Sequence, residues 1–386
     1  MSDLNKPIKT EKQEGFIQKV ISFFGRLFIS VSIPLITFIV LYFGFIFLRD
    51  SEAPQVVITL VAIVWGVGGV AGLFFSLNWF IKGLGLKWRQ RLTPFLFIGP
   101  AVVILAWYLF LPTVRTLYLS FFDKFATSVD FSKQISEHFI GLANYIFCFT
   151  DRTMLTAFVN NLVWLVAGTS LCIFFGLLLA ILTDKSFFEK TAKSLIFLPM
   201  AISFVGAGII WKFIYAYKPD IPGIEQIGLL NSFITSLGLQ PVQWLTGRPW
   251  NTLFLIVIFV WLQTGFAMII FSAAIKQVPT SMLEAAKLDG ANEFQITFRI
   301  LIPSIKSTIV TVGTTILLLT LKIFDIVFAM TNGLFGTEVL ASQQYKHSFK
   351  FLNPGRGAAV AIIILVAVIP VMIYNLKQFN KREVFK

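Results

Sequence analysis

Eight runs of mostly apolar residues divide the chain, and each has roughly the 20-residue length that a helix needs to cross a bilayer. Within lipid a helix satisfies its backbone hydrogen bonds internally, so each run predicts a transmembrane helix. The hydrophobic share of 56% against 13% charged residues excludes a soluble globule. The predicted fold class is all-α, a polytopic integral membrane helix bundle. The expected spans are 27–48, 56–81, 94–114, 158–182, 194–217, 252–275, 305–329 and 356–376.

The basic residues of the connecting segments predict the orientation of the chain. Twenty Lys and Arg residues lie on the side that carries both termini, and ten lie on the other side. Cytoplasmic loops carry the excess of Lys and Arg, so both termini are expected in the cytoplasm, as an even number of spans requires. The first run is expected to remain in the mature protein, because its charged leader of about 26 residues and its full span length are unlike a cleaved signal peptide.

The net charge of +13 does not indicate a nucleic-acid partner, because the basic residues lie between apolar runs and form no patch. Cys148, in a polar loop, and Cys172, in an apolar run, are both expected to be free thiols. His138 and His347 are isolated from other metal-ligating residues, so they are expected at the surface and no metal site is predicted. No phosphate-binding loop motif occurs, so this chain is not expected to bind ATP itself.

The outer side is expected to carry the longest loops, at 115–157, 218–251 and 330–355, which would form a low structured cap. Two charged residues, Lys322 and Asp325, fall within the seventh run, three positions apart, where they would share one helical face and could pair. Two interpretations remain open: a structural pair packed inside the bundle, or the lining of a polar pathway.

Proline residues also disturb two of the runs, Pro199 in the fifth and Pro370 in the eighth. Such breaks are tolerated where the freed backbone groups face protein or a water-filled cavity. They are consistent with a bundle that moves, although Pro is frequent in membrane helices generally and does not by itself indicate transport.

The cytoplasmic segment 276–303 has the pattern of two short helices joined by a tight turn. Pro279 stops the incoming helix, and Ser281 with Glu284 matches a capping box that would start a new one. Gly290 is placed to end that helix, because glycine adopts the left-handed conformation at little cost. A second short helix is expected from Ala291.

This second helix is expected to carry an apolar stripe of Ala291, Phe294, Phe298 and Leu301, closed by Pro303 before the next span. An apolar stripe at this place has two interpretations that periodicity does not separate. It could lie flat in the lipid interface, or it could fill a groove on a partner protein.

The string from Glu284 to Ala291, Glu-Ala-Ala-Lys-Leu-Asp-Gly-Ala, with Ile300 and Pro303 at fixed spacing after it, closely resembles the EAA loop of the membrane subunits of bacterial ABC importers. The resemblance extends over 91–386 and includes the strings 94–100, 140–145, 324–327 and 331–333. These strings are similar to those of the carbohydrate importers, in particular the first permease of maltose-type systems. The segment 321–349 is closest to the alpha-glucoside and glucosylglycerol branch.

This resemblance implies an ABC importer type I permease fold, with a six-helix core at 91–386. Residues 1–90 would form an N-terminal extension with a cytoplasmic tail and two peripheral helices. The chain would be a subunit without catalytic activity, resident in the bacterial inner membrane. Its implied partners are a second permease subunit, two copies of an ATPase subunit that hold ATP and Mg, an extracytoplasmic sugar-binding protein and membrane lipid.

In this family the EAA loop forms a coupling helix that docks into a cleft on the ATPase, and the cycle is one of alternating access. Carried over by residue, Glu284 and Ala285 would lie near the docking face, and Gly290 would set the turn. The expected coupling residues are Glu284, Ala285, Ala286, Asp289, Gly290, Ala291, Phe294 and Pro303.

Alignment with the maltose-type permease implies a substrate pathway on the spans that flank the EAA loop. The sequence departs from that permease where polar residues become Phe259 and Ile323, which puts maltose itself in doubt. Gln263 and Thr320 would hydrogen-bond a sugar and Phe266 would stack on it, although interhelical packing is an open alternative for each. The implied lining residues are Phe259, Leu262, Gln263, Phe266, Ile316, Leu319, Thr320 and Ile323.

A self-sufficient secondary transporter or channel, with Lys322 and Asp325 as an ion-coupling pair, is the main alternative. Such folds often show an internal repeat between halves, and none is visible in this sequence. A membrane-embedded enzyme would require a cluster of carboxylates, His or a nucleophile, and the loops offer no such cluster.

Overall fold

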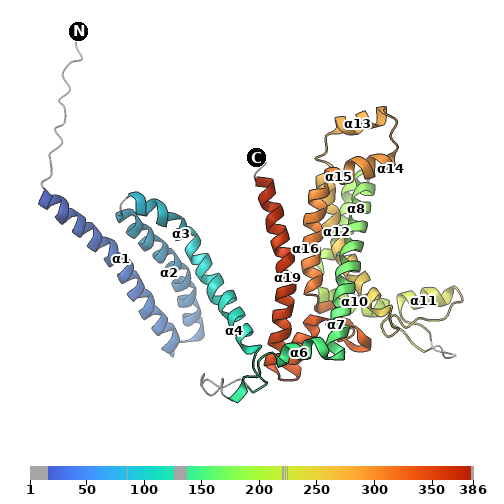
Figure 1. The fold of residues 1–386 in the computed structure, drawn as a ribbon, viewed down its shortest axis with the longest axis horizontal. Helices are drawn as coiled ribbons and strands as arrows, with labels where there is room; N and C mark the ends of the chain where they lie inside the picture. Colours follow the sequence, from blue (N-terminus) through green and yellow to red (C-terminus); the bar gives the residue numbers. More distant parts are fainter. Residues whose placement is uncertain are drawn as a thin grey trace, which may run out of the picture. The chain divides into compact units, whose positions relative to one another are not determined.

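The structure is a computed structural model that describes residues 16–84, 86–125, 137–219, 221, 223 and 225–383. Helices dominate the described residues, in which no strand is found and a single antiparallel bridge joins Phe122 to Phe139. The chain divides into two compact units, 1–113 and 114–386 (Figure 1). The all-α membrane bundle predicted from the sequence is confirmed.

The first unit consists of long helices. These are α1 (Phe16–Asp50), α2 (Gln55–Gly83), α3 (Leu86–Leu105), the π-helical turn η1 (Ala106–Phe110) and the start of α4 (Leu111–Leu119). Between α1 and α2, Gly44 leaves the space that the Trp65 indole occupies. Phe74 of α2 lies edge-on to Phe97 of α3, with ring centroids 5.4 Å apart. The third span therefore packs within this unit, while the division at residue 90 that the family resemblance implies stays a prediction.

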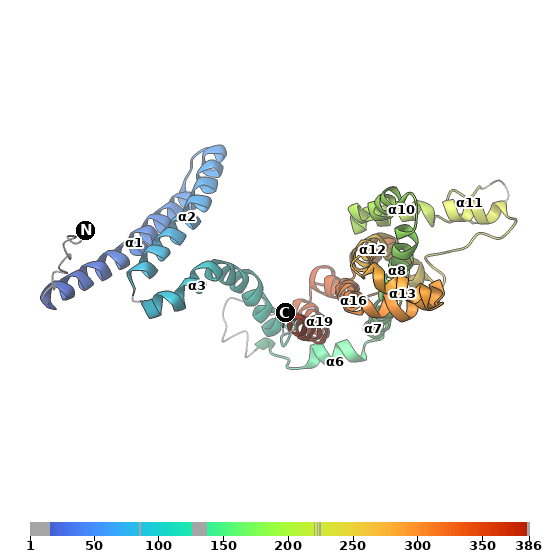
Figure 2. The same ribbon diagram turned by 90° about the horizontal axis from the view of Figure 1, so that it is seen from above.

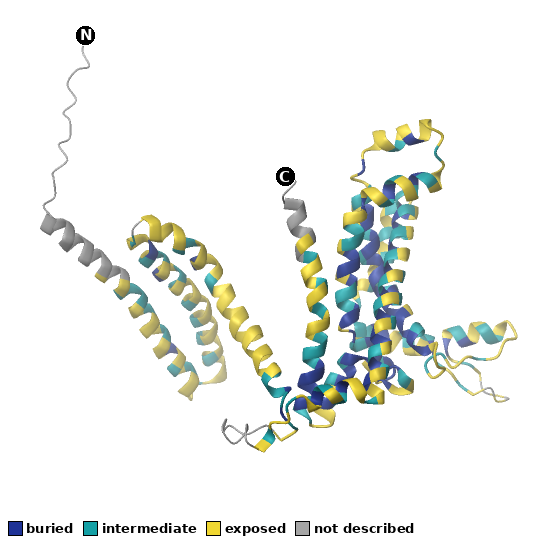
Figure 3. Cartoon of the chain, in the orientation of Figure 1, coloured by how far each residue is buried: buried dark blue, intermediate teal, exposed yellow. Residues whose placement is uncertain are grey.

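The second unit is a bundle built around α12 (Asn251–Ile275). Its other helices include α7 (Arg152–Val163), η2 (Trp164–Gly168) and α8 (Thr169–Asp184), which run on as one long span, and α19 (Pro354–Glu383). Fifteen residues of α12 are buried, because the helix is apolar on every face and other helices surround it (Figure 3). Small residues allow the closest approach: a Cβ added at Gly176 of α8 would lie 2.5 Å from the Ala267 side chain.

Within the described part of the chain, six helices are long and apolar enough to cross a membrane, and up to eight spans result if each of two bent pairs is one span. The first pair corresponds to the predicted span 194–217. There α9 (Glu189–Phe197) and η3 (Leu198–Ala201) bend by 102° against α10 (Phe204–Ile214). Pro199 lies in the first turn of η3, next to this bend. Pro370, in contrast, lies inside a continuous α19.

The predicted seventh span, 305–329, is wrong as a continuous helix. The helix α16 (Lys306–Leu321) ends at Lys322, and α17 (Asp325–Met330) begins after a break. Lys322 and Asp325 therefore do not share a helical face, and the structure shows no ion pair between these two described residues. The carbonyl freed at Leu321 instead accepts a hydrogen bond of 3.1 Å from the Asn161 side chain.

The loops predicted for the outer face contain short helices. These are α6 (Ala143–Thr150), α11 (Leu229–Ser236), η5 (Leu334–Gly336), α18 (Leu340–Tyr345) and η6 (Lys346–Lys350). Cys148 was predicted in a polar loop, but it is fully buried in α6, because this short helix packs against Ala359 and Val360 of α19. Burial raises the pKa of the Cys148 thiol to about 11. Both cysteines are free.

The surface position predicted for His347 is also wrong. This residue, in η6, is 6% exposed and packs against the rings of Phe147 and Phe351. Burial lowers the pKa of His347. His138 is partly exposed and lies 3.3 Å from an Asp123 carboxylate oxygen.

Candidate functional site

The segment with the EAA string folds as two short helices at one end of the bundle, over the ends of α8, α12 and α16 (Figures 1 and 2). The first is α13 (Thr280–Leu288) and the second is α14 (Glu293–Ile296). Gly290 has φ of 80°. Its N–H donates to the Lys287 carbonyl at 3.1 Å, and the Ala291 N–H donates to the Ala286 carbonyl at 3.0 Å. These two bonds form a Schellman motif, so the predicted glycine turn is confirmed.

The start of each helix differs from the prediction. Pro279, with ψ of 129°, is the N-cap of α13, and no side chain caps that helix. The predicted capping box of Ser281 with Glu284 is therefore wrong, because the helix begins before Ser281. A capping box occurs instead at α14, where Asn292 accepts from the Gln295 N–H at 2.8 Å and the Gln295 side chain accepts from the Asn292 N–H at 2.9 Å.

A small hydrophobic core fixes this pair of helices to the spans. Its buried members are Val278, Ala286, Ile296, Leu301 and Ile305. Ala286 is thus the inward-facing residue of the Glu-Ala-Ala string, whereas Glu284 and Ala285 are exposed. Leu288, at the end of α13, is 89% exposed.

The apolar stripe predicted on the second helix does not lie on one face. Leu301 is buried, but the rings of Phe294 and Phe298 are exposed and lie 4.3 Å apart between centroids. The reason is a π-helical turn, η4 (Thr297–Leu301), which continues α14 and shifts the helical register. The two rings border an apolar groove of about 380 Å³ against α8.

Pro303 lies one residue before the end of this helix, close to where the sequence predicted. It lies inside α15 (Ile302–Ser304), and the chain bends by 71° just after Ser304. Asp289 is the C-cap of α13 and is exposed.

Two groups of ion pairs lie at this end of the bundle, and sequence analysis missed both. In the first, Lys185 after α8 pairs with Glu293 of α14 at 2.5 Å, and Lys287 of α13 lies 3.4 Å from the same carboxylate. The available signal was the dense mixture of charges at 184–193, opposite the charges of the EAA string.

The second group joins α8, α9 and α12. Lys193 lies 2.5 Å from the Asp184 carboxylate and 2.6 Å from that of Glu189. Ser272 of α12 donates to Asp184 at 2.6 Å, and Lys276 pairs with Glu189. The side chains of Lys193 and Asp184 are only 13% and 11% exposed. This cluster, Asp184–Lys193–Glu189–Ser272–Lys276, is called the Lys193 cluster below.

The residues assigned to the substrate pathway lie together at the centre of the bundle. Phe259 of α12 meets Trp164 edge-on, with centroids 5.9 Å apart. The absence of a side chain at Gly168 allows η2 to pack closely against α12 and α16. A Cβ at this position would lie 3.2 Å from the Thr320 side chain and 3.7 Å from the Phe259 ring. Buried at this centre are Phe259, Leu262, Gln263, Ile316, Thr320 and Ile323, with Phe266 and Leu319 partly buried. Their contact with a substrate stays a prediction.

Adjacent asparagines in the fourth span, which sequence analysis did not single out, organise the opposite end of the bundle. Asn160 donates to the carbonyls of Gly336 and Glu338, each at 2.7 Å. Asn161 accepts from the Leu340 N–H at 2.7 Å in addition to its bond with the end of α16. Two amides within an apolar run were the available signal, because buried amides need polar partners.

Residues 172–384 match the model of the family described as the binding-protein-dependent transport system inner membrane component. The osmoprotective compounds uptake permease protein GgtC of Synechocystis sp. is 53% identical over 288 residues, which cover 75% of this chain and 99% of that protein. The alpha-glucoside transport system permease protein AglF of Rhizobium meliloti is 42% identical over 343 residues, 85% of this chain and 98% of that protein.

Among solved structures, a crystal structure of a bacterial ABC transporter involved in the import of the acidic polysaccharide alginate matches with a TM-score of 0.62. The match covers 75% of this chain and 98% of that one at 20% identity, and it shows a shared fold.

The chain therefore belongs to the family of inner membrane components of binding-protein-dependent transport systems. It is a multi-pass permease subunit of an ABC importer, as the EAA string predicted. The alternative of a self-sufficient secondary transporter is not favoured, because this family works with a binding protein.

Proposed function

We propose that this permease couples sugar import to ATP hydrolysis through α13 and α14, which dock on a separate ATPase subunit that holds ATP and Mg. The observation that carries the proposal is the anchored coupling segment: Ala286 faces a buried core while Glu284, Ala285 and Leu288 face outward. A helix fixed to the spans on one side and free on the other transmits a displacement of its partner to the bundle.

The proposed cargo is an alpha-glucoside, glucosylglycerol or a similar sugar. Support comes from the two relatives, which are a permease for the uptake of osmoprotective compounds and a permease for the transport of alpha-glucosides. In this proposal the sugar passes between α12 and α16, where Gln263 and Thr320 supply hydrogen bonds and Phe266 an aromatic face. Phe259 and Ile323 make this part of the pathway more apolar than in the maltose-type permease.

The complete importer in this proposal contains a second permease subunit, two copies of the ATPase and an extracytoplasmic sugar-binding protein, surrounded by membrane lipid. Both termini lie in the cytoplasm, together with α13 and α14. This orientation is supported by the excess of Lys and Arg on that side of the chain. Nucleic acid has no part in the assembly.

Gentle extraction of the tagged chain from its native membrane tests the proposal. We expect mass spectrometry to identify two further proteins in the purified complex: an ATPase with a phosphate-binding loop, and a second permease with its own EAA string. Recovery of this chain alone from several detergents, with sugar uptake intact in vesicles that contain no other protein, would contradict the proposed assembly.

A single substitution tests the pathway. We expect Gln263→Ala to raise the KM for sugar uptake about fivefold, because one net hydrogen bond contributes about 1 kcal/mol. The matched control is Gln277→Ala, an exposed glutamine beyond the end of α12. Uptake kinetics in reconstituted vesicles provide the measurement, and identical KM values for the two variants would remove Gln263 from the pathway.

A further inference from the structure

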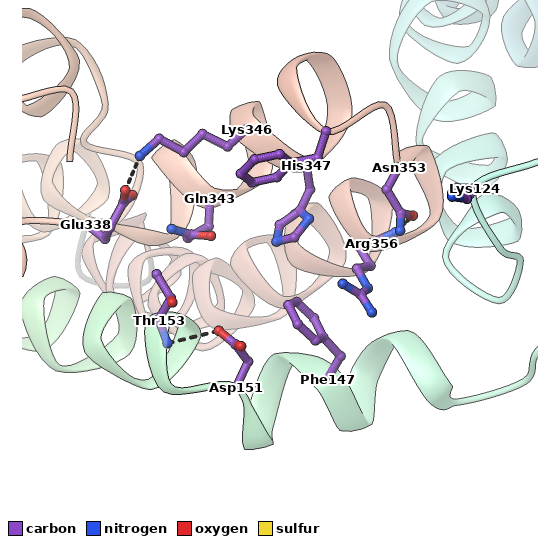
Figure 4. Close-up of a pocket in the computed structure, with 11 residues that line it drawn as sticks. Lys124, Phe147, Asp151, Thr153, Glu338, Gln343, Lys346, His347, Asn353 and Arg356 are labelled. Atoms are coloured by element: carbon purple, nitrogen blue, oxygen red, sulfur yellow. Dashed lines mark hydrogen bonds and ion pairs between the residues drawn. The ribbon is translucent and has the colours of Figure 1, made fainter. Parts of the chain in front are cut away.

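Two outer segments of the second unit build a pocket at the end of the bundle opposite α13 and α14 (Figure 4). Its volume is about 500 Å³. One wall comes from Lys124 and residues 147–153, and the other from residues 338–356. The lining residues are Lys124, Phe147, Asp151, Thr153, Glu338, Gln343, Lys346, His347, Phe351, Asn353 and Arg356.

The two carboxylates of this pocket already have partners. Asp151 caps α7 and accepts from the backbone N–H groups of Thr153 and Met154, at 2.9 and 3.1 Å. Glu338 pairs with Lys346 and accepts from the Ser342 hydroxyl at 2.6 Å. These bonds fix the anionic groups in place and neutralise one of the cationic groups.

The Arg356 guanidinium and the His347 ring have no such ion pair or hydrogen bond among the described residues. Arg356 makes no ion pair with another described residue. Its guanidinium lies over the Phe147 ring, 3.8 Å from the centroid, which holds the side chain in one position. The Phe147 ring meets His347 edge-on at 5.2 Å. His347 is buried, and its Nδ1 has no hydrogen-bond partner among the described residues.

Exposed apolar side chains lie next to the pocket in the same loop. Phe349, Phe351 and Leu352 are all exposed, and Leu352 has φ of 50°, an uncommon conformation for a leucine. A small anion would leave these side chains in water, whereas a protein partner would cover them. Arginine together with aromatic side chains is the composition typical of protein interface hot spots.

We propose that this pocket receives a carboxylate side chain of the sugar-binding protein, gripped by the Arg356 guanidinium while Phe351 and its neighbours contact the surrounding surface. A guanidinium held over an aromatic ring still presents a fork of N–H donors that matches a carboxylate. The inference rests on the proposed function, because it requires a binding protein on the outer side.

Binding measurements on the complete transporter test this site. The transporter is placed in discs of zwitterionic phospholipid, which removes anionic lipid headgroups as a competing ligand, and the Kd of the sugar-loaded binding protein is measured. We expect Arg356→Gln to raise this Kd at least about tenfold. The control Lys350→Gln removes an exposed cation from the same loop, outside the pocket, and should change the Kd less than about twofold.

A charge exchange separates a lost contact from a damaged fold. Surface Asp and Glu residues of the binding protein are replaced by Lys one at a time and tested against Arg356→Glu. Recovery of the Kd with one such variant identifies the carboxylate and supports the proposal. Equal Kd values for Arg356→Gln and Lys350→Gln, or no recovery with any exchange, would overturn it. A wild-type transporter that binds no sugar-loaded binding protein would instead contradict the proposed function.

Discussion

Gly290→Val is expected to reduce sugar uptake to about a tenth of the wild-type rate or less. The position has φ of 80°, and a Cβ there would meet nothing within 4 Å. The expected loss therefore comes from backbone conformation alone, without steric overlap. A left-handed conformation costs a residue with a Cβ roughly 1–2 kcal/mol, and a β-branched side chain tolerates it least.

The consequence reaches the bundle through the hydrogen bonds of the turn. If Gly290 leaves the left-handed conformation, the bonds to the carbonyls of Lys287 and Ala286 are lost. Ala286 belongs to the core that also contains Ile296 and Leu301, so α13 would lose its fixed position over the spans. In the proposed mechanism, ATP hydrolysis by the ATPase subunit would then no longer change the conformation of the transmembrane bundle.

Gly290→Asn is the matched control, because asparagine adopts the left-handed conformation far more readily than valine. We expect this variant to keep at least about half of the uptake. The measurement is sugar uptake and binding-protein-stimulated ATP hydrolysis in the same proteoliposomes. Equal transport by the valine and asparagine variants would show that the turn has no part in coupling.

Local chemistry explains why the coupling segment was predictable. Pro279, Gly290 and the apolar residues around them determine a helix, a turn and a second helix without help from distant residues. The predicted fold class rests on equally local information, since an apolar run of span length has few alternatives to a helix. The location of a candidate coupling site could thus be stated from the sequence.

The break after α16 depends on residues far away in the sequence and could not be predicted in this way. Hydropathy favours a continuous helix through Lys322. The helix instead ends where the side-chain amide of Asn161, 160 residues earlier in the chain, donates a hydrogen bond to the Leu321 carbonyl. This amide replaces the helical N–H that would otherwise donate to that carbonyl. Asn161 bonds to Leu340 with the same side chain, so three segments meet at one amide. The hydropathy pattern of one segment contains no information about hydrogen bonds to segments far away in the sequence.

The errors in the outer segments have the same origin. Cys148 lies in a helix too short to be read as a span, and its burial follows from packing against Ala359 and Val360. His347 is buried by the rings of Phe147 and Phe351, which come from separate segments. In each case the exposure of a residue depends on partners that only the folded chain supplies.

Lys193→Met is expected to lower the melting temperature of the assembled transporter by about 5 °C. The Lys193 ammonium contacts Asp184, Glu189 and Ser272 in the Lys193 cluster. Methionine preserves much of the side-chain volume but leaves Asp184 buried and without its cation. Removal of one partner of a buried ion pair costs roughly 3–5 kcal/mol, and each kcal/mol lowers the melting temperature of a chain this large by about 2–4 °C or less.

The cluster offers both a control and a rescue. Lys190→Met removes an exposed cation three residues away on the same helix, and the melting temperature should stay within about 1 °C of wild type. Asp184→Asn combined with Lys193→Met removes both charges, so much of the lost stability should return if the unpaired carboxylate is the cause. One Asp184 oxygen already lacks a hydrogen-bond partner among the described residues, which makes the anion especially dependent on Lys193. A Lys193→Met transporter as stable as the Lys190→Met control would show that the cluster contributes nothing to holding α8, α9 and α12 together.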